Sequence, residues 1–248
     1  MAGEARRDRS ADSGYVKARA GGDAYGNHFG FLLIVLVTVY VLSAFVTGTW
    51  VKAVEVVLYL AAALLAVRTA RVPRRTALLA LAVTVGGLAA AMVLVLTFSS
   101  GPGAGAGYLL MAVALALAAV LVLYRVLGTG QDVTLQSIFG AISVYMILGF
   151  MFAVVYAAIN EFGHGDFFAA GEAASMKTFQ YFSFVTLTTV GYGDFTAATS
   201  GGRAVAVLEA ISGQVFLATL VARLVSAYRG PQRPGDDERT SHPPDPSG

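Results

Sequence analysis

Six apolar segments, each long enough to cross a bilayer, constrain the fold of this chain more than any other feature. A membrane helix needs about 20 apolar residues, because it rises about 1.5 Å per residue through about 30 Å of hydrocarbon. Hydrophobic residues make up 56% of the 248-residue chain and charged residues only 13%, about half the usual charged share of soluble proteins. We therefore predict an all-α membrane protein with six transmembrane helices, at approximately 29–46, 50–67, 76–98, 108–127, 135–159 and 203–228.

The composition also excludes several kinds of function. Cysteine is absent, which removes disulfides, thiolate metal sites and a cysteine nucleophile, and the three histidines lack any metal-ligand spacing. The net charge of +2 does not indicate nucleic-acid binding. We predict no catalytic residues and no enzymatic activity.

The two ends of the chain are polar. Residues 1–28 and the Pro- and Asp-rich residues 229–248 are expected to be disordered and cytoplasmic. No soluble ligand-binding domain is expected in the chain.

Basic residues predict the orientation, because cytoplasmic loops are enriched in lysine and arginine. With six spans, the basic positions fall on one side of the membrane, and the opposite loops carry few. We expect a multi-pass protein of the plasma membrane with both termini in the cytoplasm. The basic positions are Arg6, Arg7, Arg9, Lys17, Arg19, Arg68, Arg71, Arg74, Arg75, Arg125, Arg223, Arg229 and Arg233.

Two loops stand out between the apolar segments. The loop between the fifth and sixth contains SMKTFQYFSFVTL (175–187), which is apolar and aromatic but too short to span. This pattern predicts a re-entrant helix, which is tolerated where protein or a water-filled cavity surrounds it. The second loop, SSGPGAGAG (99–107), lacks the Lys-Ser/Thr pair of a phosphate-binding loop. We predict a flexible connection there.

The re-entrant segment leads into TLTTVGYGD (186–194), whose two glycines flank one tyrosine. A potassium ion in a narrow pore loses its water and needs replacement oxygens. Carbonyls alternate in direction along an ordinary strand, but they point the same way if the handedness of the backbone alternates. Gly191 and Gly193 suit the positive φ angles of such a strand, and the Thr189 hydroxyl adds a further oxygen. We predict potassium binding by Thr189, Val190, Gly191, Tyr192 and Gly193, the first four as direct ligands.

Residues 181–194, YFSFVTLTTVGYGD, resemble the pore helix and selectivity filter of potassium channels. Residues 201–228 resemble the inner helix of bacterial two-helix pore modules, so the resemblance covers about 133–228. It implies a homotetramer in a lipid bilayer, with potassium ions as the only cofactor. It divides the chain into a four-helix membrane domain at 29–128 and a pore domain at 133–228.

The resemblance also assigns roles outside the filter. Gly213 falls at the family's gating hinge, and Asp194 lies just outside the filter, where it holds the back of the filter or attracts cations. Four residues are implied to line the central cavity, namely Thr188, Gln214, Leu217 and Val221.

One departure from the family concerns a carboxylate. Some relatives carry a glutamate four residues before the filter threonine, where this chain has Val185, whereas Glu209 lies inside the sixth helix. A carboxyl group inside a membrane is a candidate functional group. Two interpretations remain open: Glu209 supports the filter through a hydrogen bond to Ser183 or Thr186, or it is a protonated, merely structural group.

The first four predicted helices occupy the position of a voltage sensor but lack its charges. Such a sensor needs arginine at every third residue of the fourth helix, and this helix has only Arg125. The favoured function is a potassium-selective, passive channel that is not conventionally voltage-gated. The alternatives are a potassium transporter and a non-conducting sensor or assembly subunit on a channel fold.

Overall fold

The computed structural model describes residues 28–45, 74–98, 100–127, 134–163 and 165–227. Within these ranges the regular structure is helical, apart from one isolated β-bridge between Phe168 and Ala197. The helices are α2 (His28–Phe45), α4 (Arg74–Thr97), α5 (Pro102–Leu127), α6 (Leu135–Phe162), α7 (Met176–Leu187) and α8 (Ser200–Ala227).

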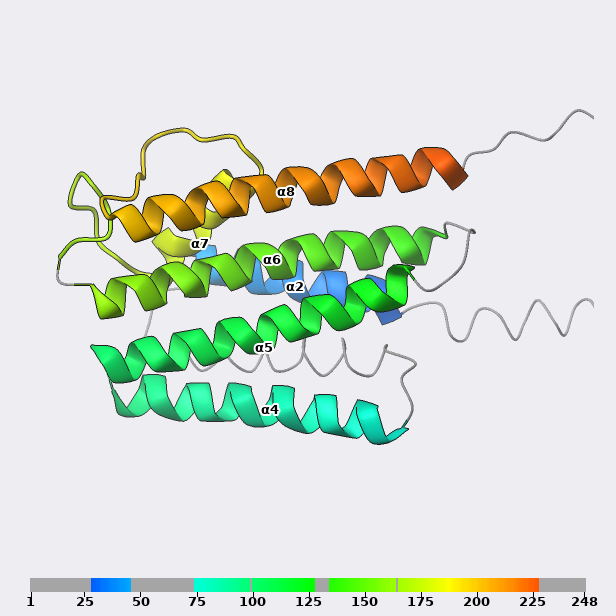
Figure 1. Cartoon of the computed structure of the whole chain (residues 1–248), viewed down its shortest axis with the longest axis horizontal. Helices are drawn as coiled ribbons and strands as arrows, with labels where there is room; N and C mark the ends of the chain where they lie inside the picture. The colour runs from blue at the N-terminus through cyan, green and yellow to red at the C-terminus, as the bar shows by residue number, and fades with distance from the viewer. Residues whose placement is uncertain (1–27, 46–73, 99, 128–133, 164, 228–248) are drawn as a thin grey trace, which may run out of the picture.

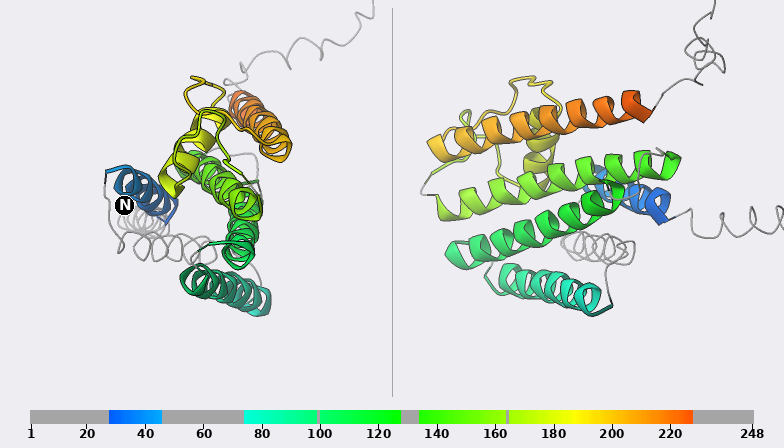
Figure 2. Two further views of the ribbon diagram at one scale, coloured as in Figure 1. Left: turned by 90° about the vertical axis from the view of Figure 1, so that its left-hand side faces the viewer. Right: turned by 45° about the vertical axis from the view of Figure 1, so that its right-hand side comes forward.

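The long helices α4, α5, α6 and α8 lie side by side in that order, with α2 packed against α6 (Figure 1). The short helix α7 contacts both α6 and α8 and lies near the end where α8 begins, as the right-hand view of Figure 2 shows. The first residue of α2 and the last of α8 lie at the same, opposite end of the bundle (Figure 1). The bundle therefore places α7 and residues 188–194, which follow it, at one end of the molecule.

The main core is built from α2, α4, α5 and α6. Leu32, Leu88, Leu115, Val144 and Phe150 are among its buried side chains. A second cluster of aromatic side chains packs around α7. Buried residues of α5 and α6 belong to this same core, and the division into domains at 29–128 and 133–228 stays a prediction.

Helix α8 is packed far less than the others. Only 11% of its most apolar 18-residue stretch is buried, compared with 56% of the corresponding stretch of α6. It presents a row of exposed large apolar side chains, which are Val207, Leu208, Ile211, Val215, Leu217, Val221 and Val225. This surface needs a lipid or protein environment, because such a large apolar patch is unusual in contact with water.

Helix lengths support a multi-pass membrane protein. Three helices of the described part are long and apolar enough to span, at Pro102–Tyr124, Leu135–Phe162 and Ser200–Ser226, and shorter apolar helices cover Phe29–Phe45 and Ala82–Thr97. The predicted first, third, fourth, fifth and sixth segments coincide with α2, α4, α5, α6 and α8. The predicted second segment, 50–67, lies outside the described residues, so the number of six spans stays a prediction.

The prediction of a flexible connection at 99–107 was wrong for most of its length, because residues 102–107 form the start of α5. Proline suits the first position of a helix, since its missing N–H needs no partner there. The preceding Gly101 N–H donates a hydrogen bond to Glu161 Oε2 at 2.7 Å. Gly107 lies so close to α4 that an added Cβ would come within 3.0 Å of the Ala91 carbonyl oxygen. Here the glycine permits helix packing.

Candidate functional site

Helix α7 has a well-defined beginning and end. Its N-terminus carries a capping box, in which Ser175 Oγ accepts from the Thr178 N–H at 3.2 Å and Thr178 Oγ1 accepts from the Ser175 N–H at 2.9 Å. The helix ends at Leu187, and Thr188 forms its C-cap. The negative end of the helix dipole therefore adjoins the residues that follow, 188–194.

Residues 189–193 have the backbone alternation that the sequence predicted. Thr189, Gly191 and Gly193 have φ angles of +57°, +54° and +80°, whereas neither of the intervening residues has a positive φ. The positive φ at both glycines confirms the expectation for them. The positive φ at Thr189 was not predicted, since non-glycine residues rarely adopt it.

Residues 189–193 belong to no β-sheet and are called the strand below. The N–H groups at its start point back to α7. The Thr189 N–H donates to the Thr186 carbonyl at 2.9 Å, and those of Val190 and Gly191 donate to the Val185 carbonyl at 3.0 and 3.3 Å. In the described part of the chain, no hydrogen bond is accepted by a carbonyl of residues 189–193. The backbone donors are thus held by the protein, while the backbone oxygens are left available to a ligand.

A side-chain contact holds the far end of the strand. The Tyr181 hydroxyl of α7 donates to Asp194 Oδ2 at 2.7 Å. This hydrogen bond raises the pKa of Tyr181 to about 12, so the hydroxyl remains a donor at physiological pH. Nothing in the sequence predicted the pair, because the two residues lie 13 positions apart across a helix end and a strand.

Helix α8 lies close to the end of α7 at Gly213. A Cβ added to Gly213 would lie 2.3 Å from the Leu187 carbonyl oxygen, so a larger residue requires a backbone shift. The same carbonyl accepts a hydrogen bond from the Tyr145 hydroxyl of α6 at 2.9 Å. The structure therefore gives Gly213 a packing role. Helix α8 continues through Gly213 without a break, and the role of Gly213 as a gating hinge stays a prediction.

The next residue of α8 reaches the base of the strand. Gln214 Nε2 donates to Thr189 Oγ1 at 3.3 Å. Leu217 and Val221 follow on the same helix with exposed side chains. The Thr188 hydroxyl donates back to the Phe184 carbonyl at 2.6 Å. Of the four predicted cavity residues, Gln214 and Thr188 therefore adjoin the strand directly.

Glu209 is completely buried between α6, α7 and α8. Its Oε1 lies 2.5 Å from Ser183 Oγ, and its Oε2 lies 2.5 Å from the Tyr156 hydroxyl. The sequence suggested Ser183 or Thr186 as a hydrogen-bond partner of Glu209, and the structure contains the contact with Ser183. Sequence reasoning missed Tyr156, since it lies 53 residues away and only helix packing brings it to Glu209.

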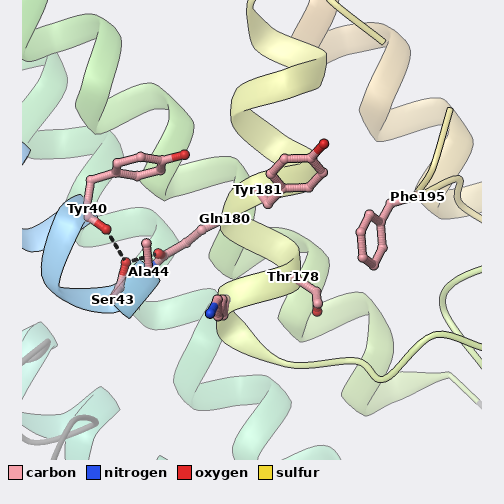
Figure 3. Close-up of a pocket in the computed structure, with 8 residues that line it drawn as sticks. Tyr40, Ser43, Ala44, Thr178, Gln180, Tyr181 and Phe195 are labelled. Atoms are coloured by element: carbon pink, nitrogen blue, oxygen red, sulfur yellow. Dashed lines mark hydrogen bonds between the residues drawn. The ribbon is translucent and has the colours of Figure 1, made fainter. Parts of the chain in front are cut away.

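Helix α2 also reaches α7. Ser43 Oγ lies 2.5 Å from Gln180 Oε1 and 2.8 Å from the Tyr40 carbonyl, and the Tyr40 and Phe184 rings meet edge to face at 4.9 Å. Figure 3 shows Tyr40, Ser43 and Gln180 at one side of a cavity of about 240 Å³, whose lining also includes Tyr181. Helix α2 is thus in direct contact with the helix that positions the strand.

Comparison with known proteins agrees with this arrangement. Residues 111–229 match the family model described as ion channel. The matched region begins inside α5 and includes α6, α7, the strand and α8, which is slightly less than half of the chain. Searches of curated proteins and of solved structures gave no significant match. The helices that surround the strand therefore lie in a segment that matches an ion-channel family.

The contact between Gly213 and Leu187 leads to a first prediction. We expect Gly213→Ala to lower the free energy of unfolding by about 1–3 kcal/mol, because the new methyl group overlaps a backbone oxygen. Denaturant unfolding in detergent measures the change. Gly201→Ala on the same helix is the matched control, since its Cβ would meet no atom within 4 Å. Equal stabilities of the two variants would contradict the packing role.

Proposed function

We propose that this protein is a potassium-selective channel, in which four copies of the chain surround one pore and ions move passively. The observation that carries the proposal is the backbone of residues 189–193. Alternating φ, tethered N–H groups and unpartnered carbonyls are what a strand needs if it is to offer oxygens to a dehydrated cation. The match of residues 111–229 to an ion-channel family supports the same function.

The direct ligands are proposed to be the oxygens of Thr189, Val190, Gly191 and Tyr192, with Gly193 completing the filter. A tyrosine between the two glycines favours potassium over less selective cation pores. The negative end of α7 adjoins the strand, which favours a cation at its inner end. The hydrogen bond from Gln214 still leaves Thr189 Oγ1 a lone pair for an ion.

A homotetramer is proposed because one subunit cannot enclose an ion by itself. A single strand cannot surround an ion, whereas four-fold symmetry closes a ring of oxygens. In the single chain, residues 188–194 are exposed, and so is the apolar row on α8. In the proposed tetramer these surfaces face the pore, the neighbouring subunits and lipid. Thr188, Gln214, Leu217 and Val221 then line the cavity below the filter.

The remaining features concern the membrane and gating. The first residue of α2 and the last residue of α8 lie at the same end of the bundle (Figure 1). This placement supports both termini on one side of the membrane, which is proposed to be the cytoplasmic side of the plasma membrane. Helix α5 carries one arginine, Arg125, so steep voltage sensing through this helix is not proposed. Helix α2 contacts α7 directly. This contact makes α2 a route by which the helices before α6 can act on the filter.

The oligomeric state tests the proposal most directly. We expect native mass spectrometry of the full chain, purified in detergent, to give four times the subunit mass of 25.8 kDa. The symmetry argument requires four strands around the ion. A protein that stays a monomer at all concentrations, and in lipid, would contradict the proposed pore.

Ion flux into liposomes tests conduction and selectivity. We expect the wild type to carry potassium while largely excluding sodium, and we expect Gly191→Ala to abolish this flux, because alanine disfavours a φ of +54°. Gly171→Ala is the matched control: it also replaces an unobstructed glycine of positive φ, +76°, but in the loop between α6 and α7. Loss of flux in both variants would show a general folding defect. Sodium and potassium carried equally would contradict selectivity.

The contact between Tyr181 and Asp194 gives a prediction about the outer end of the filter. Tyr181→Phe removes the donor to Asp194 and keeps the ring, whose centroid lies 5.5 Å from that of Phe195. We expect potassium flux to decline faster with time, whereas the unfolding midpoint should hardly change, because the ring of this half-buried residue is kept. Stopped-flow flux assays measure the change, and Tyr124→Phe on α5, at an exposed tyrosine far along the chain, serves as the control.

A further inference from the structure

A cluster of four oxygen-bearing groups joins three helices within one subunit. Glu209 of α8 is 0% exposed. Its two carboxyl oxygens lie 2.5 Å from the Tyr156 hydroxyl of α6 and 2.5 Å from Ser183 Oγ of α7. Ser183 Oγ also lies 2.7 Å from the Gly149 carbonyl oxygen of α6. Each of these three separations is a hydrogen-bond distance between two oxygens, so each contact needs a proton.

The number of available protons decides the state of the cluster. The Tyr156 and Ser183 hydroxyls bring one proton each, and the Gly149 carbonyl is only an acceptor. An ionised Glu209 brings none, which leaves one of the three contacts without a proton. A protonated Glu209 satisfies all three: it donates from Oε1 to Ser183, Ser183 donates to Gly149, and Tyr156 donates to Oε2.

The surroundings of Glu209 favour the same state. In the described part of the chain no cationic side chain interacts with it. The titratable groups that interact with it are Tyr156 and Tyr145, both on α6, and from α7 the facing group is the Ser183 hydroxyl. None of these supplies a positive charge. A fully buried carboxylate without a countercharge is unfavourable, whereas a hydrogen-bonded neutral acid is tolerated.

We propose that Glu209 is a positioning residue that acts in its protonated form, holding the inner helix α8 against α7 and thereby fixing the filter strand. One turn further along α8, Gly213 touches the Leu187 carbonyl and Gln214 donates to Thr189. The proton on Glu209 therefore sets the distance between α8 and the base of the strand. Its loss at alkaline pH leaves a buried charge and one unmade hydrogen bond, and the contact between α8 and α7 weakens.

The proton itself is tested by infrared spectroscopy on the full-length protein. We expect the wild type near neutral pH to show the C=O stretching band of a protonated carboxyl, and we expect Glu209→Gln to lack it. Glu161→Gln is the matched control, since Glu161 accepts from the Gly101 N–H outside the cluster, and this variant should keep the band. Absence of the band in the wild type at neutral pH would overturn the proposal.

The positioning role is tested by a pH profile, and this step rests on the proposed channel function. Glutamine mimics the acid at every pH, because its amide donates toward Ser183 and its oxygen accepts from Tyr156. We expect wild-type potassium flux to fall by about tenfold between pH 7 and pH 10, a modest coupling between two sites, and flux of Glu209→Gln to change less than about twofold. Identical profiles would overturn the positioning role.

Two further measurements keep the test decisive. If neither protein conducts, the proposed function fails separately, and the unfolding midpoint then decides: it should fall with rising pH in the wild type and not in Glu209→Gln. If Glu209→Gln does not fold, Tyr156→Phe takes its place. This variant removes a donor that favours the carboxylate over the acid, so the carboxyl band should persist to higher pH. A band lost at the same pH as in the wild type would overturn the assignment.

Discussion

The carboxyl-terminal end of α7 is the point on which the rest of the structure depends. Its last carbonyls are occupied from three directions: Leu187 by the Tyr145 hydroxyl and the close approach of Gly213, and Val185 and Thr186 by the N–H groups of the strand. Because α6, α8 and the strand all meet there, a shift of α7 would move each of them. The unusual backbone of residues 189–193 is held in place by this arrangement, since positive φ at Thr189 is unfavourable by itself.

The backbone N–H groups and the backbone carbonyls of the strand differ in their partners, and this difference determines what the strand can bind. The N–H groups of residues 189–191 are satisfied by α7, so no water is needed to hydrate them. The carbonyl oxygens have no partner in the described residues, and only a ligand or solvent can satisfy them. This asymmetry makes a cation a fitting occupant. It also explains why a subunit without its neighbours is incomplete, because one strand offers oxygens from one side only.

Three polar contacts in the described part of this apolar protein connect segments that lie far apart in the chain. Ser43 meets Gln180 between α2 and α7, Glu161 binds the turn before α5, and Glu209 joins α8 to both α6 and α7. In hydrocarbon, apolar packing alone gives little orientational preference, whereas a buried hydrogen bond is satisfied in only one arrangement. These contacts therefore fix the relative positions of helices whose remaining surfaces are largely alanine, leucine and valine.

The sequence alone determined the helical class, the bounds of five apolar helices to within six residues, and the positive φ of Gly191 and Gly193, because length, hydropathy and glycine placement are local properties. It failed at residues 102–107, where glycines that indicate a loop in water serve as contact points between helices. Only the tertiary structure decided that Tyr181 meets Asp194, that Gly213 touches Leu187, and that Tyr156 and Gly149 complete the cluster around Glu209. These pairs are made by how helices far apart in the chain pack, and no spacing along the sequence encodes that packing.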